Sequence, residues 1–158
     1  MRRFHLLIRS WPYVAVLVSG MLLWPTGIEV PAHAQETAEY KVIVNASNPL
    51  STMSRNQAAR IFLKKEERWS NGFAITVVDL ATDHPARLAF SRAVLGKEAD
   101  AVEAYWRKLI FSGMGSPPLK LATDAEVVTF VGNNVGSISY VSDDTELGVA
   151  VKELEVNQ

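Results

Sequence analysis

The chain of 158 residues contains no cysteine. The sequence therefore offers no disulfide bond, no thiolate nucleophile, no zinc–thiolate cluster and no cysteine-linked lipid anchor. It also lacks an excess of charge of one sign, because 16 Lys+Arg stand against 17 Asp+Glu and the pI is near 6.3. Nucleic acid is not an expected partner, since its binding by counterion release needs a basic surface.

Histidine is also scarce, and His84 is the only one beyond residue 34. There is no Gly-x-Ser-x-Gly elbow, so a hydrolase would need its nucleophile, base and orienting group assembled from scattered residues. Asp79, Asp83 and His84 are legitimate metal ligands, but the set is incomplete and has no recognised spacing. We therefore predict a protein that is not an enzyme and that needs no metal or cofactor.

The amino-terminal region has the pattern of a secretory signal peptide. Arginines come first, an uncharged apolar stretch follows at Val14–Trp24, and Ala32-His33-Ala34 offers the small residues that signal peptidase needs. We predict a signal peptide over residues 1–34, cleaved after Ala34, and a periplasmic protein with no stable membrane anchor after cleavage. The alternative is a transmembrane anchor, although the apolar stretch is shorter than the roughly 20 residues that span a bilayer.

The remaining chain is long enough for one small domain. Residues 35–40 are polar and expected to be flexible, and residues 41–158 are predicted to form a single domain. Apolar runs typical of buried strands alternate there with stretches whose apolar residues recur at helical spacing. This alternation predicts an α/β fold, a three-layer sandwich with a mostly parallel central sheet covered by helices on both faces.

Local patterns place the individual elements. The predicted strands are Lys41–Asn45, Ala74–Leu80, Leu119–Ala122, Ser137–Val141 and Gly148–Val156. The predicted helices begin at a capping box Ser54–Gln57, at Thr82 or Asp83 with Pro85 in the first turn, at a capping box Asp100–Glu103, and at Asp124 as the cap. The segment Phe111–Pro118 is predicted to be a loop because it holds two glycines and two prolines.

Two segments could carry a ligand site. Ligands of open α/β sheets collect where strands end and where helix N-termini offer unpaired amides. The first segment contains Ser47 and Asn48 after the first strand, and the second contains Thr82, His84 and Arg87 after the second strand. A helix dipole together with an arginine favours an anion as the ligand.

Both segments also have a purely structural interpretation. Ser47-Asn48-Pro49 is an ordinary turn sequence, and Thr82 and Asp83 are ordinary helix caps. Asp83 has the spacing to pair with Arg87 at the surface of a helix. Asp83 also opposes an anion, because a carboxylate in the first helical turn competes for the same amides.

Three stretches of the chain together resemble the phosphate-binding-protein family of periplasmic solute receptors. They are Val42–Ser51 running into Ile61–Gly72, Ile75–Val78 followed by Phe90, and Gly136–Val141. The resemblance covers nearly the whole domain. It implies the type II periplasmic-binding-protein fold and a receptor that delivers a small oxyanion such as phosphate to an ABC transporter.

The chain also departs from this family. It resembles one lobe alone, whereas the family grips phosphate between two lobes that close by a hinge motion. The family's phosphate ligands, an arginine and a Ser-Gly-Thr run, are replaced here by Leu80 and by His84-Pro85-Ala86. The loop after residue 110 resembles one in short single-lobe relatives, and its candidate site-lining residues are Ser112, Gly113, Gly115 and Ser116.

The sequence leaves two hypotheses for the function. In the first, the lobe binds a small oxyanion, and the candidate ligands are Ser47, Asn48, Thr82, His84 and Arg87. This hypothesis expects Arg87→Ala to abolish binding while the fold stays intact. In the second, the lobe has lost its ligand and is an interaction module that docks on an ABC transporter, another envelope protein or a second copy of itself.

Overall fold

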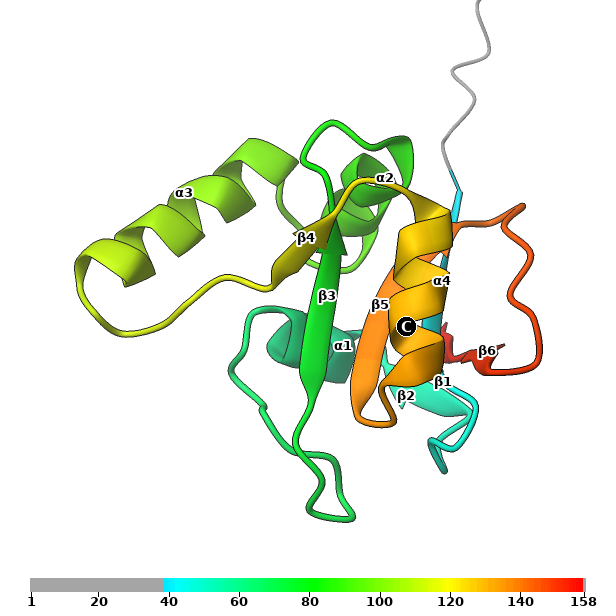
Figure 1. The fold of residues 1–158 in the computed structure, drawn as a ribbon. Helices are drawn as coiled ribbons and strands as arrows, with labels where there is room; N and C mark the ends of the chain where they lie inside the picture. Colours follow the sequence, from blue (N-terminus) through cyan, green and yellow to red (C-terminus); the bar gives the residue numbers. More distant parts are fainter. Residues whose placement is uncertain (1–38, 158) are drawn as a thin grey trace, which may run out of the picture. The chain divides into compact units, whose positions relative to one another are not determined.

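A computed structural model describes residues 39–157 of the chain. The predicted signal peptide and residues 35–38 lie outside the described residues, whereas Tyr40 is the first residue of β1. The elements are, in order, β1 (Tyr40–Asn45), β2 (Thr52–Ser54), α1 (Arg55–Phe62), β3 (Thr76–Leu80), α2 (Pro85–Ala93), α3 (Ala99–Phe111), β4 (Leu119–Leu121), α4 (Asp124–Asn133), β5 (Ser137–Ser142), β6 (Val151–Glu153) and β7 (Glu155–Asn157) (Figure 1).

The central sheet has five strands in the order β4-β3-β5-β1-β6. β3 pairs in parallel with β4 and with β5, while β1 is antiparallel to its neighbours β5 and β6. Every strand except β1 therefore runs in the same direction, which confirms the mostly parallel sheet. A second, small sheet pairs β2 with β7 in parallel.

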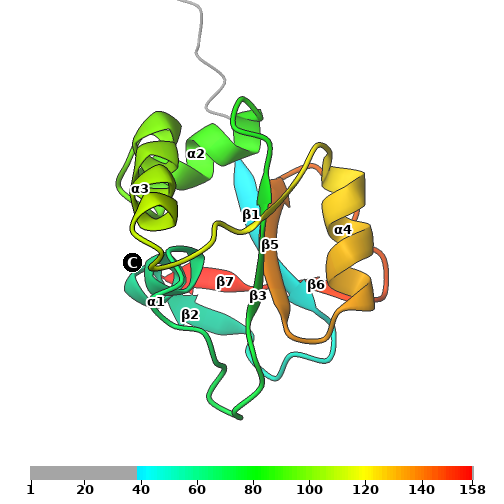
Figure 2. The same ribbon diagram turned by 60° about the vertical axis from the view of Figure 1, so that its left-hand side comes forward.

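Helices cover both faces of the central sheet (Figure 2). α1, α2 and α3 lie on one side and α4 lies alone on the other, so the three-layer prediction is confirmed. α2 packs on β1 and β5, whereas α3 packs on α2 and lies farther from the sheet. The outer position of α3 leaves its far end projecting from the body of the domain (Figure 1).

The strands at the centre of the sheet are buried on both faces. In β3 the four residues from Val77 to Leu80 are all buried, and in β5 the five residues from Ser137 to Val141 are buried. Continuous buried runs of this kind suit a sheet covered on two sides, because neither face can reach water. One hydrophobic core within the described residues joins the sheet to α1, α2 and α4. The described residues 39–157 belong to one compact unit, and this core lies within it.

Local capping signals were half correct for α1 and wrong for the next two helices. Ser54 caps α1 by accepting a hydrogen bond from the amide of Gln57, but the Gln57 side chain donates to Glu66, so the predicted capping box is incomplete. α2 begins at Pro85 with His84 as its cap, so neither Thr82 nor Asp83 is the cap. α3 begins after Glu98, and the predicted capping box Asp100–Glu103 is absent, because the Glu103 carboxylate is bound elsewhere.

Three further boundaries differ from the sequence prediction. α4 is capped by Thr123 in a complete capping box with Glu126, and Asp124 is its first residue. The predicted last strand is divided into β6 and β7, which join different sheets. β2 was not predicted, since three residues are too few to show a periodic pattern.

Gly136 allows a close approach that a side chain would prevent. A methyl group built on its Cα would overlap the carbonyl oxygen of Ala74. The Gly136 carbonyl also accepts hydrogen bonds from the Thr76 amide at 3.1 Å and from the Trp69 indole at 3.0 Å. The start of β5 is therefore held against the start of β3.

We expect Gly136→Ala to lower the free energy of unfolding by about 1–3 kcal/mol, because the backbone at Ala74 must move. Gly115→Ala is the matched control, since the added methyl group would meet its nearest neighbour, the side chain of Leu109, at an ordinary 3.8 Å. Urea unfolding of residues 35–158 measures the free energy of unfolding of both variants. Equal stability of the two variants would contradict the close contact.

Candidate functional site

The two segments proposed from the sequence lie at opposite ends of the sheet. β1 is antiparallel to β5, and Val44 faces Ile138 near the start of β5. β3 is parallel to β5, so its end at Leu80 lies toward the other end of β5. Ser47 and Asn48 are therefore not brought together with the residues that follow β3.

In the segment with Ser47 and Asn48, both residues form hydrogen bonds within the turn. The Asn48 side chain is buried, and its oxygen accepts the Leu50 amide at 2.9 Å. The Ser47 amide binds the side-chain oxygen of Asn45, whose own amide group donates to Val131 and Gly132 at the end of α4. These contacts match the turn interpretation.

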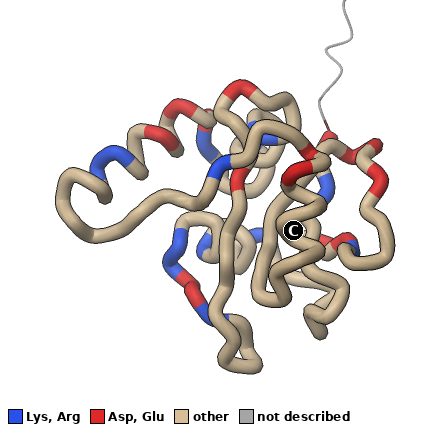
Figure 3. The backbone as a smooth tube through the Cα atoms, viewed as in Figure 1, with Lys and Arg blue, Asp and Glu red and all other residues tan. Residues whose placement is uncertain are grey.

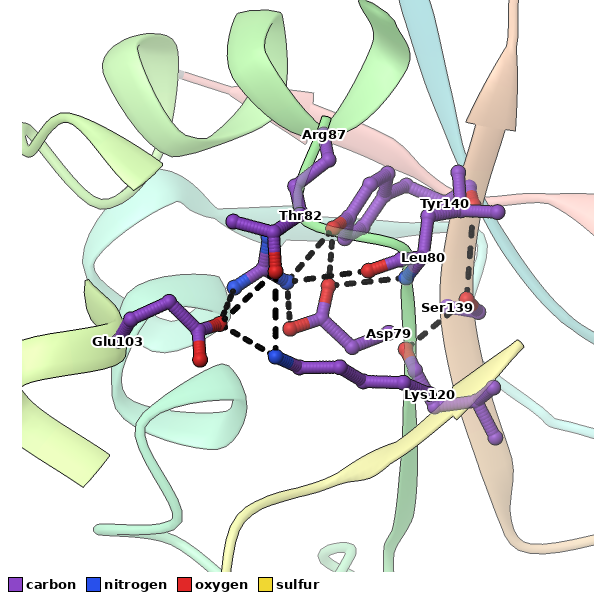
Figure 4. Close-up of polar contacts among 9 residues, drawn as sticks. Asp79, Leu80, Thr82, Arg87, Glu103, Lys120, Ser139 and Tyr140 are labelled. Atoms are coloured by element: carbon purple, nitrogen blue, oxygen red, sulfur yellow. Dashed lines mark hydrogen bonds and ion pairs between the residues drawn. The ribbon is translucent and has the colours of Figure 1, made fainter. Parts of the chain in front are cut away.

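Arg87 lies at the centre of the second segment, in the first turn of α2, and it is buried to 1% exposure. Its Nη1 forms an ion pair with Oδ2 of Asp79, the last but one residue of β3. Its Nη2 donates to Oε1 of Glu103 at 2.9 Å (Figure 4). The expected surface pair with Asp83 is therefore wrong, because the guanidinium points into the protein.

Tyr140 completes the inner part of this cluster. Its hydroxyl donates to Oδ1 of Asp79 in a short hydrogen bond and lies 3.5 Å from Nη1 of Arg87. Its ring stacks on Phe90 with the centroids 4.0 Å apart. Burial raises the pKa of Tyr140 to about 12, and the positive charge of Arg87 offsets only part of that increase.

Glu103, Lys120 and Thr82 form the outer part of the cluster. Glu103 Oε1 accepts from Lys120 Nζ at 2.6 Å, and Thr82 Oγ1 lies within 3.5 Å of both groups. Partial burial would raise the pKa of Glu103, but the hydrogen bond and charge of Lys120 and the charge of Arg87 outweigh it and lower the pKa. Glu103 therefore stays ionised.

We call these six residues the Arg87 cluster, namely Asp79, Thr82, Arg87, Glu103, Lys120 and Tyr140 (Figure 4). It contains two cations and two carboxylates in direct contact. The charges cancel within the cluster, so Arg87 presents no unpaired positive charge to an external anion. The sequence indicated Asp79 only as a weak metal ligand, although an aspartate inside an apolar strand is itself a sign of a buried charged partner.

His84 lies beside the cluster and faces α4. Its Nε2 is 3.8 Å from Oδ1 of Asp124, and its buried Nδ1 has no hydrogen-bond partner among residues 39–157. Asp124 also accepts from the Ser142 amide and the Thr145 hydroxyl. His84 is thus placed at the same end of the sheet as Thr82.

The glycine-rich loop lies away from both segments. Glu103 touches Arg87 near the start of α3, and Ser112 follows nine residues later, about 13 Å farther along the helix axis. The structure therefore does not bring Ser112, Gly113, Gly115 and Ser116 together with the other candidate residues.

Within residues 39–157, no group of three or more acidic or histidine side chains is arranged to hold a metal ion. None of the helices in the same range has the length and apolar character needed to cross a bilayer.

No protein-family model matches the sequence, and no curated protein matches it. Several solved structures are similar to it, including the following three. An ABC-type phosphate transport receptor from Vibrio cholerae has a TM-score of 0.58 and 18% identity over 78% of this chain and 51% of that one. A candidate phosphate ABC transporter substrate-binding protein from Clostridium perfringens, with bound phosphate, has a TM-score of 0.58 and 18% identity over 75% of this chain and 45% of that one. PstS from Borrelia burgdorferi has a TM-score of 0.53 and 12% identity over 77% of this chain and 48% of that one.

These similarities confirm the fold expected from the sequence. The chain matches one lobe of a PstS-like binding protein and spans about half the length of these receptors.

We expect Arg87→Ala to lower the free energy of unfolding by about 3–5 kcal/mol, because it leaves the Asp79 carboxylate buried without its partner. This corrects the expectation that the variant would keep its fold intact. Arg92→Ala is the matched control in the same helix, since its ion pair with Glu98 is exposed and should contribute less than about 1 kcal/mol. Urea unfolding measures the free energy of unfolding of both variants. Similar losses of stability in the two would contradict a structural role for Arg87.

We also expect the domain to lose stability between pH 10 and pH 12. The unfolded chain releases the Tyr140 proton near pH 10, whereas the folded domain holds it to about pH 12. The contribution is complete below pH 10 and falls by about 2–3 kcal/mol as the pH rises through this range. Urea unfolding at several pH values should show a smaller loss for Tyr140→Phe, and an equal loss in both proteins would contradict the assignment.

Proposed function

We propose that this domain is an exported receptor-type lobe that binds a small oxyanion such as phosphate and acts beside an ABC transporter. The observation that carries the proposal is the fold, which matches one lobe of proteins described as phosphate transport receptors. Export would depend on residues 1–34, whose pattern is that of a signal peptide.

The end of β3 is the best candidate for the oxyanion site. α2 begins there, and no side chain caps its first amides. Helix N-termini bind anions because these amides are unpaired and the helix dipole is positive at that end. The His84 ring lies beside this helix start and could donate a hydrogen bond, and the Thr82 hydroxyl could donate one in place of its long 3.5 Å contact with Glu103.

Charge limits how strongly the lobe can bind an anion by itself. Both cations of the Arg87 cluster are paired with carboxylates, and Asp83 is exposed next to the helix start. An oxyanion would therefore receive hydrogen bonds here but little net positive charge. We infer that a second protein surface supplies the missing cation.

The second candidate function is an interaction module that has lost its ligand and docks on an envelope protein. The observation that favours it is the same neutralisation of Arg87, because it removes the residue that would hold an anion most strongly. The scaffold could then be retained for its surface alone.

Thermal unfolding of residues 35–158 with phosphate, sulfate, arsenate and molybdate at matched ionic strength separates the two functions. An oxyanion at about 100 times its Kd should add about 2.7 kcal/mol, a shift of several degrees in Tm. We expect one oxyanion to give a specific shift that Thr82→Val reduces.

Thr129→Val is the matched control, since Thr129 lies exposed on α4 and its hydroxyl binds only the Ala125 carbonyl. It should leave the oxyanion shift unchanged. No shift with any of the four oxyanions would overturn the binding proposal and favour the interaction module.

A further inference from the structure

The far end of α3 carries apolar side chains that contact little else in the described chain. Ile110 is 51% exposed, Phe111 90% and Met114 70%. We call these three residues the apolar tip. They lie where α3 ends and the chain turns back toward β4, at the part of the domain that projects from its body (Figure 1).

The backbone of the tip is held by its own hydrogen bonds. The Gly113 amide binds the Ile110 carbonyl at 3.0 Å, and the Met114 amide binds the Leu109 carbonyl at 3.0 Å. Gly113 has a φ of 68°, which lets the chain close the helix end tightly. These bonds form a compact turn that presents Phe111 outward.

The charged residues next to the tip in the sequence are all basic. Residues 104–123 contain no Asp or Glu, and their cations are Arg107, Lys108 and Lys120. The rest of the described chain carries more acidic than basic residues. Within α3 the acidic side chains lie in the first half and the basic ones lie next to the tip (Figure 3). Lys120 is paired with Glu103, so Arg107 and Lys108 are the cations nearest the tip.

We propose that the apolar tip docks this domain on an anionic lipid surface. Phenylalanine, methionine and isoleucine can insert at the boundary between headgroups and acyl chains, while adjacent Lys and Arg attract anionic lipids. A stable protein interface usually buries about 800 Å² on each partner, which three side chains on a projecting turn do not provide. Binding to a bilayer requires only that the tip itself inserts among the lipids. This inference does not rest on oxyanion binding.

Flotation with lipid vesicles tests the proposal on residues 35–158, which contain the compact unit and its core. Residues 1–34 are left out because their own basic and apolar residues could bind lipid. We expect the domain to float with vesicles of phosphatidylcholine and phosphatidylglycerol, and much less with phosphatidylcholine alone. Salt of about 0.5 M should weaken the binding, because it screens the lipid charge.

Phe111→Ser combined with Met114→Ser should reduce partitioning about tenfold or more, since two apolar insertions are lost. Phe73→Ser is the matched control, because Phe73 is 63% exposed in the loop before β3 and lies outside the tip. Arg107→Gln combined with Lys108→Gln should lower binding to anionic vesicles and remove most of its salt dependence. Thermal unfolding checks that each variant is folded.

Two results would overturn the proposal. One is the absence of binding to anionic vesicles at low salt, which would leave the tip as a contact for a protein partner. The other is binding that the Phe111 and Met114 substitutions reduce no more than Phe73→Ser does. Either result leaves the oxyanion measurements unaffected, so the two proposals fail separately.

Discussion

The ion pair between Arg87 and Asp79 is the interaction on which the arrangement of this domain depends. It joins the first turn of α2 to the end of β3, and through Tyr140 and Glu103 it reaches β5 and α3. A charged pair at this depth is stable only while both partners remain, because removing one leaves an ion in an apolar surrounding. Four elements are thus fixed to one another by groups that must all be present together.

The same pair constrains what the domain can bind. A guanidinium with carboxylates on two sides has little attraction left for an external anion, even though it lies in the first turn of a helix. The fold resembles one lobe of phosphate receptors, yet its one arginine at this position stabilises the domain internally. Affinity for an oxyanion must then come from amides and hydroxyls, or from a second protein.

The sequence predicted the layers of the fold but not the composition of the site. Hydrophobic periodicity located β1, β3 and β5 because it reflects burial, which the strand's own residues determine. Strand direction depends on pairing between distant segments, so the reversal of β1 and the separation of Asn48 from Arg87 could not be deduced. Glu103 shows a similar limit: its spacing from Asp100 suggested a capping box, but two cations from other elements compete more strongly for its carboxylate.

α3 connects the two regions to which we assign functions. Glu103 near its start is held by Arg87 and Lys120, and Tyr105 donates to the Leu63 carbonyl at 3.2 Å. The buried Trp106 fixes the middle of the helix, and the apolar tip lies beyond it. Because a helix is a rigid rod over this length, the contacts at its start set the direction in which Phe111 points. The charge pairing that removes Arg87 from anion binding therefore also holds the tip away from the body of the domain, where a lipid surface can reach it.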